Sequence, residues 1–243
     1  MEQKRGSFTG GLGFVLTAAG SAVGLGNLWR FPYLAAQYGG GIFILVYIIL
    51  ALTFGFALMT TEIAIGRKTK SSPITAYSKL DKRFGFLGII ASIVPVIILP
   101  YYCVIGGWVL KYFAVFMKGE ASLAAQDGYF TNYIGQVNQP IVWTVVFIAA
   151  VLFFVILGVK GIEKASKILM PILAVLSVII AVYSVTRPGA IEGLKYYLIP
   201  DISNFSMMTV VAALGQMFYS LSIAMGVLFA YGSYMNKKID MEA

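Results

Sequence analysis

The chain has 243 residues, of which 59% are hydrophobic and 12% are charged, and its mean hydropathy is +0.85. This composition lies far outside the range of soluble domains and indicates an integral membrane protein. The sequence contains no histidine and one cysteine, Cys103. An intramolecular disulfide is therefore excluded, as are a histidine-ligated metal and a histidine general base.

Six long apolar segments follow one another along the chain. Each is long enough to cross the hydrocarbon core of a bilayer as a helix, which rises about 1.5 Å per residue. We therefore expect an all-α membrane protein with six transmembrane helices in a single domain, residues 1–243. The expected spans are residues 11–36, 41–66, 86–117, 141–159, 168–186 and 207–235.

The positions of the basic residues predict the orientation of the chain. Of the 18 Lys and Arg residues, 13 lie near the N-terminus, in the loops 67–85 and 160–167, or after residue 236. The alternate loops hold only Lys118, Arg187 and Lys195. Because cytoplasmic loops carry the excess of Lys and Arg, we expect the N-terminus in the cytoplasm and the protein in the plasma (inner) membrane. The formal net charge of +8 thus reflects topology, and we expect no nucleic-acid partner.

The first apolar segment is poorly suited to a regular helix. Its middle, from Gly20 to Pro32, reads GSAVGLGNLWRFP and contains three glycines, an asparagine, an arginine and a proline. Each interior glycine costs about 1 kcal/mol relative to alanine, and Pro32 removes a backbone donor. Broken backbone at membrane depth is tolerated only where protein or a polar cavity covers it. We therefore expect residues 21–26 to form an unwound hinge between two half-helices, beside a bound polar group.

The sixth segment repeats this feature. Polar residues and glycines gather in its middle, between Gly215 and Gly226. Two interrupted helices, one opening each half of a presumed repeat, indicate the site of a transporter.

Two further features fall inside spans. The third segment contains Pro95 and Pro100, which bend a helix, and Gly106–Gly107, which lets another helix pack closely. A carboxylate at membrane depth is costly, so we expect Glu62 to face protein or water and to meet a donor. We favour a structural role for Glu62, such as holding the hinge or a neighbouring helix end, over a role in ion coupling.

The broken first helix predicts a pair of neighbouring binding sites. Carbonyl oxygens freed at residues 20–24, together with the side-chain oxygens of Asn27 and Ser220, suit a singly charged cation, and sodium is the natural candidate. The second half-helix begins near Leu25 and presents N–H groups to an anion such as a carboxylate. A cation and an anionic substrate bound side by side favour each other's binding, which is a physical route to coupling.

These motifs resemble the neurotransmitter:sodium symporter family, in its bacterial amino-acid branch. The resemblance rests on the run from Gly20 to Pro32, on Gly39–Gly41, on Tyr101–Tyr102 and on the run from Gly215 to Ser222, in this order. It implies a five-helix repeat followed by the first helix of an inverted copy, with helices 1 and 6 unwound in mid-membrane. It also implies a sodium-coupled symporter working by alternating access, and not an enzyme.

The resemblance assigns roles to individual residues. At position 24 the monoamine carriers of the family have an aspartate, whereas Gly24 leaves room for a substrate that brings its own carboxylate, so a neutral, apolar or aromatic amino acid is implied.

The implied substrate-binding residues are Ala22, Leu25, Gly26, Tyr102, Tyr219, Ser220, Ser222 and Met225. One implied sodium site uses Ala22, Asn27 and Ser220, and a second uses Gly20 and Val23. The implied gate residues are Arg5, Arg30 and Tyr234. Chloride, which some members require, is implied at Tyr47, Gln216 and Ser220.

The length of the chain is the main departure from the family, whose members are about twice as long. We therefore expect an N-terminal half that is not transport-competent alone and that needs further C-terminal helices or a partner chain. The alternatives are one part of a split carrier and a membrane interaction module that does not transport. A membrane enzyme is disfavoured, because no nucleophile–base pair is visible within the spans.

Overall fold

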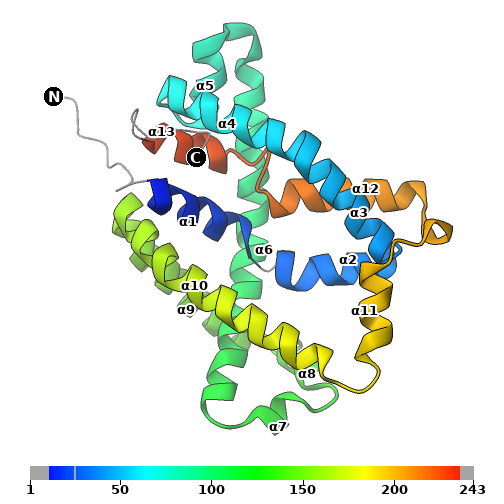
Figure 1. The fold of residues 1–243 in the computed structure, drawn as a ribbon. Helices are drawn as coiled ribbons and strands as arrows, with labels where there is room; N and C mark the ends of the chain where they lie inside the picture. Colours follow the sequence, from blue (N-terminus) through cyan, green and yellow to red (C-terminus); the bar gives the residue numbers. More distant parts are fainter. Residues whose placement is uncertain (1–10, 25, 236–243) are drawn as a thin grey trace.

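The computed structural model describes residues 11–24 and 26–235 (Figure 1). The described part is built from helices and contains no strand beyond an isolated β-bridge between Gly40 and Pro200. The elements of the first half are α1 (Gly11–Ala22), the π-helical turn η1 (Gly26–Arg30), α2 (Phe31–Gln37), α3 (Gly41–Leu50), the π-helical turn η2 (Ala51–Gly55), α4 (Phe56–Thr69), α5 (Pro73–Leu80), the 3-10 turn η3 (Lys82–Phe84) and α6 (Gly85–Met117). Those of the second half are α7 (Ala121–Ala124), α8 (Tyr129–Ile134), α9 (Asn138–Ile156), α10 (Gly158–Val185), α11 (Ala190–Leu198), the 3-10 turn η4 (Ile202–Asn204), α12 (Met207–Ser220) and α13 (Val227–Tyr234).

Within the described residues, four continuous helical stretches are long and apolar enough to cross a membrane. They are Gly41–Thr69, Lys82–Met117, Asn138–Ile156 and Gly158–Val185. The chain is thus a multi-pass membrane protein. The other two expected spans, 11–36 and 207–235, are divided into shorter helices, so neither appears as one long helix.

The expected boundary between the fourth and fifth spans is wrong. Residues 160–167, expected as a loop, belong to α10, which begins at Gly158. Gly158 has a φ of +67°, so the chain reverses within a single turn after α9. The charges of this stretch are compatible with a helix, because Lys167 and Glu163 lie one turn apart and form a 2.8 Å salt bridge.

Both divided segments are interrupted near their middle. In the first, α1 ends at Ala22, Val23 and Gly24 lie in a bend, and the amides of Asn27 and Leu28 both donate to the Gly24 carbonyl. The helix therefore continues two residues further than expected, through Ser21 and Ala22. In the second, α12 ends at Ser220 and the six residues 221–226 separate it from α13.

The two halves of each interrupted segment pack against different neighbours. Phe14 of α1 and Met235, just after α13, form one buried cluster together with residues of α4 and α10. Ala35 of α2, Phe43 of α3 and Ala213 of α12 form another. Figure 1 shows α1 and α13 at one end of the molecule and α2, α3 and α12 at the other. The interruptions therefore lie at the seam between two packing units.

Glycines allow the long helices to approach closely. A Cβ at Gly66 of α4 would lie 2.2 Å from the Phe229 carbonyl oxygen of α13, and a Cβ at Gly232 of α13 would lie 2.5 Å from the Ile63 carbonyl oxygen. A Cβ at Gly107 would lie 2.7 Å from the Thr144 amide nitrogen of α9, which confirms the expected close packing at Gly106–Gly107.

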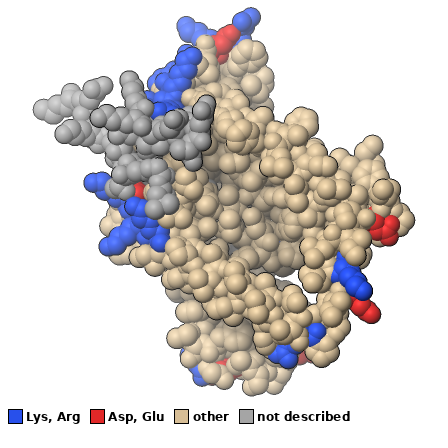
Figure 2. Space-filling view, viewed as in Figure 1, with Lys and Arg blue, Asp and Glu red and all other residues tan. Residues whose placement is uncertain are grey.

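Most of the charged residues visible in Figure 2 lie towards the ends of the molecule, whereas Arg30 and Glu62 lie near the interruptions. On the face seen in Figure 2, Lys and Arg gather around the α5 end and the beginning of α10, with a smaller mixed group near α11. A wide band without charges lies between these regions, as expected for the belt of a membrane protein that contacts hydrocarbon.

We predict that Gly66→Ala destabilises the protein by about 1–3 kcal/mol, because the new methyl group meets backbone that cannot move aside. Gly193→Ala in α11 is the matched control, since nothing lies within 4 Å of a Cβ there. Thermal denaturation of the purified variants in detergent measures the difference. Equal melting temperatures for the two variants would contradict the close packing of α4 and α13.

Candidate functional site

A cavity of about 310 Å³ lies where the two interruptions meet α6. The end of α1 and the start of η1 form one wall, the stretch of α6 that precedes Gly106 forms another, and the residues around the α12–α13 interruption form the third. Its lining residues are Gly20, Ala22, Gly24, Asn27, Pro95, Ile98, Leu99, Tyr102, Tyr219, Ser222, Met225 and Val227.

Most of the expected substrate-binding residues meet at this cavity. Five of them line it: Ala22, Tyr102, Tyr219, Ser222 and Met225. The rings of Tyr102 and Tyr219 are 6.1 Å apart and tilted by 37°. Gly26 is buried against Tyr219, and a Cβ at Gly26 would lie 2.3 Å from the Tyr219 ring. Leu25 lies outside the described residues.

Three residues of α6 that line the cavity were not predicted from the sequence to do so. Pro95, Ile98 and Leu99 precede Tyr102 by seven, four and three positions. These are the spacings at which residues share one face of a helix, so the position of Tyr102 was the signal that pointed to them. They make this wall of the cavity largely apolar.

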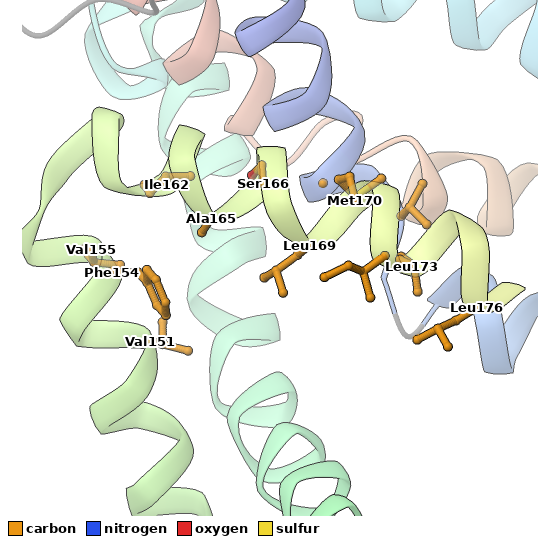
Figure 3. A pocket seen from close by; sticks show the side chains of 13 residues that line it. Val151, Phe154, Val155, Ile162, Ala165, Ser166, Leu169, Met170, Leu173 and Leu176 are labelled. Carbon is orange, nitrogen blue, oxygen red and sulfur yellow. The ribbon is translucent and has the colours of Figure 1, made fainter.

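The expected sodium ligands divide between two places. Ala22 and Asn27 line the cavity just described, whereas Val23 lines a second cavity of about 630 Å³ between α1, α9 and α10, and Gly20 lines both. Figure 3 shows this second cavity, with Ser166 and Met170 near the end of α1 and an apolar row along α10.

Ser220 does not line either cavity but is buried beside α3. Its hydroxyl lies 2.7 Å from the hydroxyl of Tyr47. Gln216, one turn earlier on α12, is fully buried and donates through Nε2 to the carbonyl of Gly26 at 3.1 Å, while its Oε1 has no partner among the described residues. The three residues implied in chloride binding therefore lie close to the first interruption.

Arg30, the expected outer gate residue, lies over the ring of Tyr219. Its guanidinium carbon is 5.0 Å from the ring centroid, within the range of a cation–π interaction. Arg30 and Tyr219 line a small cavity together with Ile97, Ile98 and Tyr101. Of the other gate residues, Tyr234 packs against the cluster of Phe14 and Met235, and Arg5 lies outside the described residues.

Glu62 faces protein and meets a donor, as expected. Its carboxylate is buried, and Oε1 accepts a 2.7 Å hydrogen bond from the backbone amide of Ala224 in the α12–α13 interruption. Glu62 thus contacts a neighbouring chain interruption, in line with the expectation that it holds a neighbouring helix end.

Comparisons with known proteins point to a transporter family. The family model of the sodium:neurotransmitter symporter family matches residues 5–126 and 120–243. The chain is 36% identical to the uncharacterised sodium-dependent transporter YhdH of Bacillus subtilis, covering 97% of this chain and 54% of the relative. It is 38% identical to an uncharacterised sodium-dependent transporter of Methanocaldococcus jannaschii, with coverages of 98% and 51%.

A similar solved structure is that of MhsT in complex with L-phenylalanine. The TM-score is 0.88 at 38% sequence identity, and the match covers 96% of this chain and 54% of the solved chain. The chain thus spans about half the length of the relatives that it matches. Members of the matching family are transporters and not enzymes. This chain belongs to the sodium:neurotransmitter symporter family.

Proposed function

We propose that this chain forms most of the substrate site of a sodium-coupled symporter that carries a neutral amino acid by alternating access. The observation that carries the proposal is the cavity at which Ala22, Tyr102 and the α12–α13 interruption meet. We propose that helices 1 and 6 of the transporter are the two interrupted segments, and that both interruptions lie near the middle of the membrane.

The lining of the cavity supports an apolar or aromatic amino acid. The residue at position 24 is glycine, so this wall offers no carboxylate to an amine, and Ile98, Leu99 and Met225 surround the remaining space with apolar side chains. We propose that the substrate carboxylate meets the amides at Leu25 and Gly26 and the hydroxyl of Tyr102. Its amino group meets carbonyls near Ala22, Tyr219 and Ser220.

One sodium ion is proposed to bind beside this carboxylate, at the Ala22 carbonyl with Asn27 and Ser220. Carbonyls in the last turn of a helix lack donors from their own helix, which leaves the end of α1 able to bind a cation. Oxygen ligands of this kind, without a cluster of carboxylates, suit a singly charged ion. The Ser220 hydroxyl lies 2.7 Å from that of Tyr47 and does not line the cavity of Ala22 and Asn27, so the proposed site requires this hydroxyl to move towards the ion.

A second sodium ion is proposed at the carbonyls of Gly20 and Val23. The cavity beside them is lined by apolar side chains of α9 and α10, and Ser166 supplies the one side-chain hydroxyl among its lining residues. A hard cation needs more oxygen ligands than this set provides. This deficit supports the proposal that helices beyond those described complete the site.

The surroundings of Arg30 also support the proposal that further helices complete the transporter. Within the described part of the chain, the guanidinium of Arg30 contacts the ring of Tyr219. An arginine at membrane depth is costly unless it pairs with a carboxylate or faces water. We therefore propose that the transport unit consists of this chain and the C-terminal helices or partner chain that complete it, and that an acidic partner of Arg30 lies in the added part.

Chloride is a proposed further ligand, at Tyr47, Ser220 and Gln216. Tyr47 and Ser220 place two hydroxyl groups 2.7 Å apart, and the Gln216 amide lies one turn away on α12. The location that we propose is the plasma (inner) membrane, with the N-terminus and the lysine-rich end around α5 in the cytoplasm.

We predict that uptake of a neutral amino acid by the transport unit stops when potassium replaces sodium, since potassium is too large for a cage built around sodium. Radiolabelled phenylalanine uptake into proteoliposomes measures this. Uptake that continues at the same rate in potassium would contradict the proposed coupling.

Tyr102→Phe should raise the substrate KM about tenfold or more, because a hydrogen bond to a charged group contributes about 1.5–3 kcal/mol. Tyr101→Phe is the matched control, since Tyr101 is its neighbour and is more exposed than Tyr102. The two KM values are compared in the same uptake assay. An unchanged KM in Tyr102→Phe would show that its hydroxyl does not bind the substrate.

Expressed alone, the 243-residue chain should give no sodium-dependent uptake, and co-expression with the C-terminal half of a relative should restore it. The split carrier predicts in addition that a second polypeptide copurifies with the chain. If neither co-expression nor a copurifying protein yields uptake, the non-transporting interaction module becomes the better account.

A further inference from the structure

The backbone between α12 and α13 adopts a conformation that its residues disfavour. Ser222 has a φ of +53°, Ala224 of +61° and Gly226 of +73°. Glycine adopts such angles freely, whereas a residue with a Cβ does so at a cost. Two of these three positions therefore need an external contact to hold them.

Glu62 supplies that contact at Ala224. It reaches the interruption from α4, its side chain is 7% exposed, and Oε1 accepts the Ala224 amide proton at 2.7 Å. A backbone amide held away from water is costly without an acceptor, so this hydrogen bond stabilises the conformation at Ala224. Its second oxygen, Oε2, is buried without a partner among the described residues. Among the described residues, the carboxylate of Glu62 therefore binds the backbone of the interruption and not another side chain.

Ala224 lies in the sequence between two residues that line the cavity of the proposed substrate site. Ser222 and Met225 both line the cavity, whereas the Ala224 side chain is exposed and is not part of the lining. Ile223, between them, is 1% exposed and anchors the loop in the protein. The direction in which Ser222 and Met225 face the cavity therefore depends on the backbone angles at Ala224.

We propose that Glu62 is a positioning residue for substrate selection. By holding the left-handed backbone at Ala224, it fixes Ser222 and Met225 and so sets the size of side chain that the cavity accepts. This inference rests on the proposed function, since it concerns the choice among neutral amino acids at the same cavity. Glu62 itself does not line the cavity and acts through the backbone.

A double-mutant cycle tests the proposal in the complete transport unit. Glu62→Gln keeps the shape but replaces one carboxyl oxygen with an NH2 group, which cannot accept a hydrogen bond, and should reduce the ratio of kcat/KM for phenylalanine over alanine about tenfold. Ala224→Gly added to Glu62→Gln should restore the ratio to within about twofold, because glycine adopts a φ of +61° without cost. Ala212→Gly, in the regular helix α12, is the matched control and should restore nothing.

A purely structural role for Glu62 would lower the amount of folded protein and leave this ratio unchanged. If Glu62→Gln alone yields no folded protein, Glu62→Asp takes its place in the cycle, because it keeps the carboxyl group but shortens its reach to Ala224. An unchanged ratio in Glu62→Gln, or equal rescue by both glycine variants, would overturn the inference while leaving the proposed function intact. Absence of sodium-dependent uptake by the complete, unsubstituted transport unit would instead overturn the proposed function, and the selection role with it.

Discussion

The need to satisfy backbone polar groups where two helices are interrupted governs this structure. A regular helix pairs its own N–H and C=O groups, but an interrupted one in a membrane must find partners elsewhere. Here the partners come from side chains of other helices, since Gln216 binds the carbonyl of Gly26 and Glu62 binds the amide of Ala224. Each interruption is therefore joined to a distant part of the chain, and the groups that remain are available to ligands.

The packing places the proposed site at the boundary between two packing units. α1 packs with α13 and α10, while α2 packs with α3 and α12, so the two halves of one segment belong to different units. A ligand that contacts both halves would bridge the two units. The proposed alternating access would use this bridge, since it makes the arrangement of the units depend on the ligand.

Much of this arrangement could be predicted from residue types. The glycines and Pro32 indicated the first interruption and the polar cluster around Ser220 the second, whereas Tyr102 was assigned to the site by the family resemblance. The α10 boundary could not be predicted, because a charged stretch such as residues 160–167 reads as a loop unless the pairing of Glu163 and Lys167 is known. Nor does the sequence reveal that Glu62 meets Ala224, since that contact joins residues 162 positions apart through the tertiary fold.

The central claim is that the loosened end of α1 binds a sodium ion beside the carboxylate of an amino acid. The most direct measurement is an electron cryo-microscopy structure of the transport unit in nanodiscs with sodium and phenylalanine. The account predicts density for the substrate carboxylate between Gly26 and Tyr102, with a cation at Ala22 and Asn27. A continuous helix through residues 20–27 that faces lipid, or phenylalanine bound away from Tyr102, would contradict it.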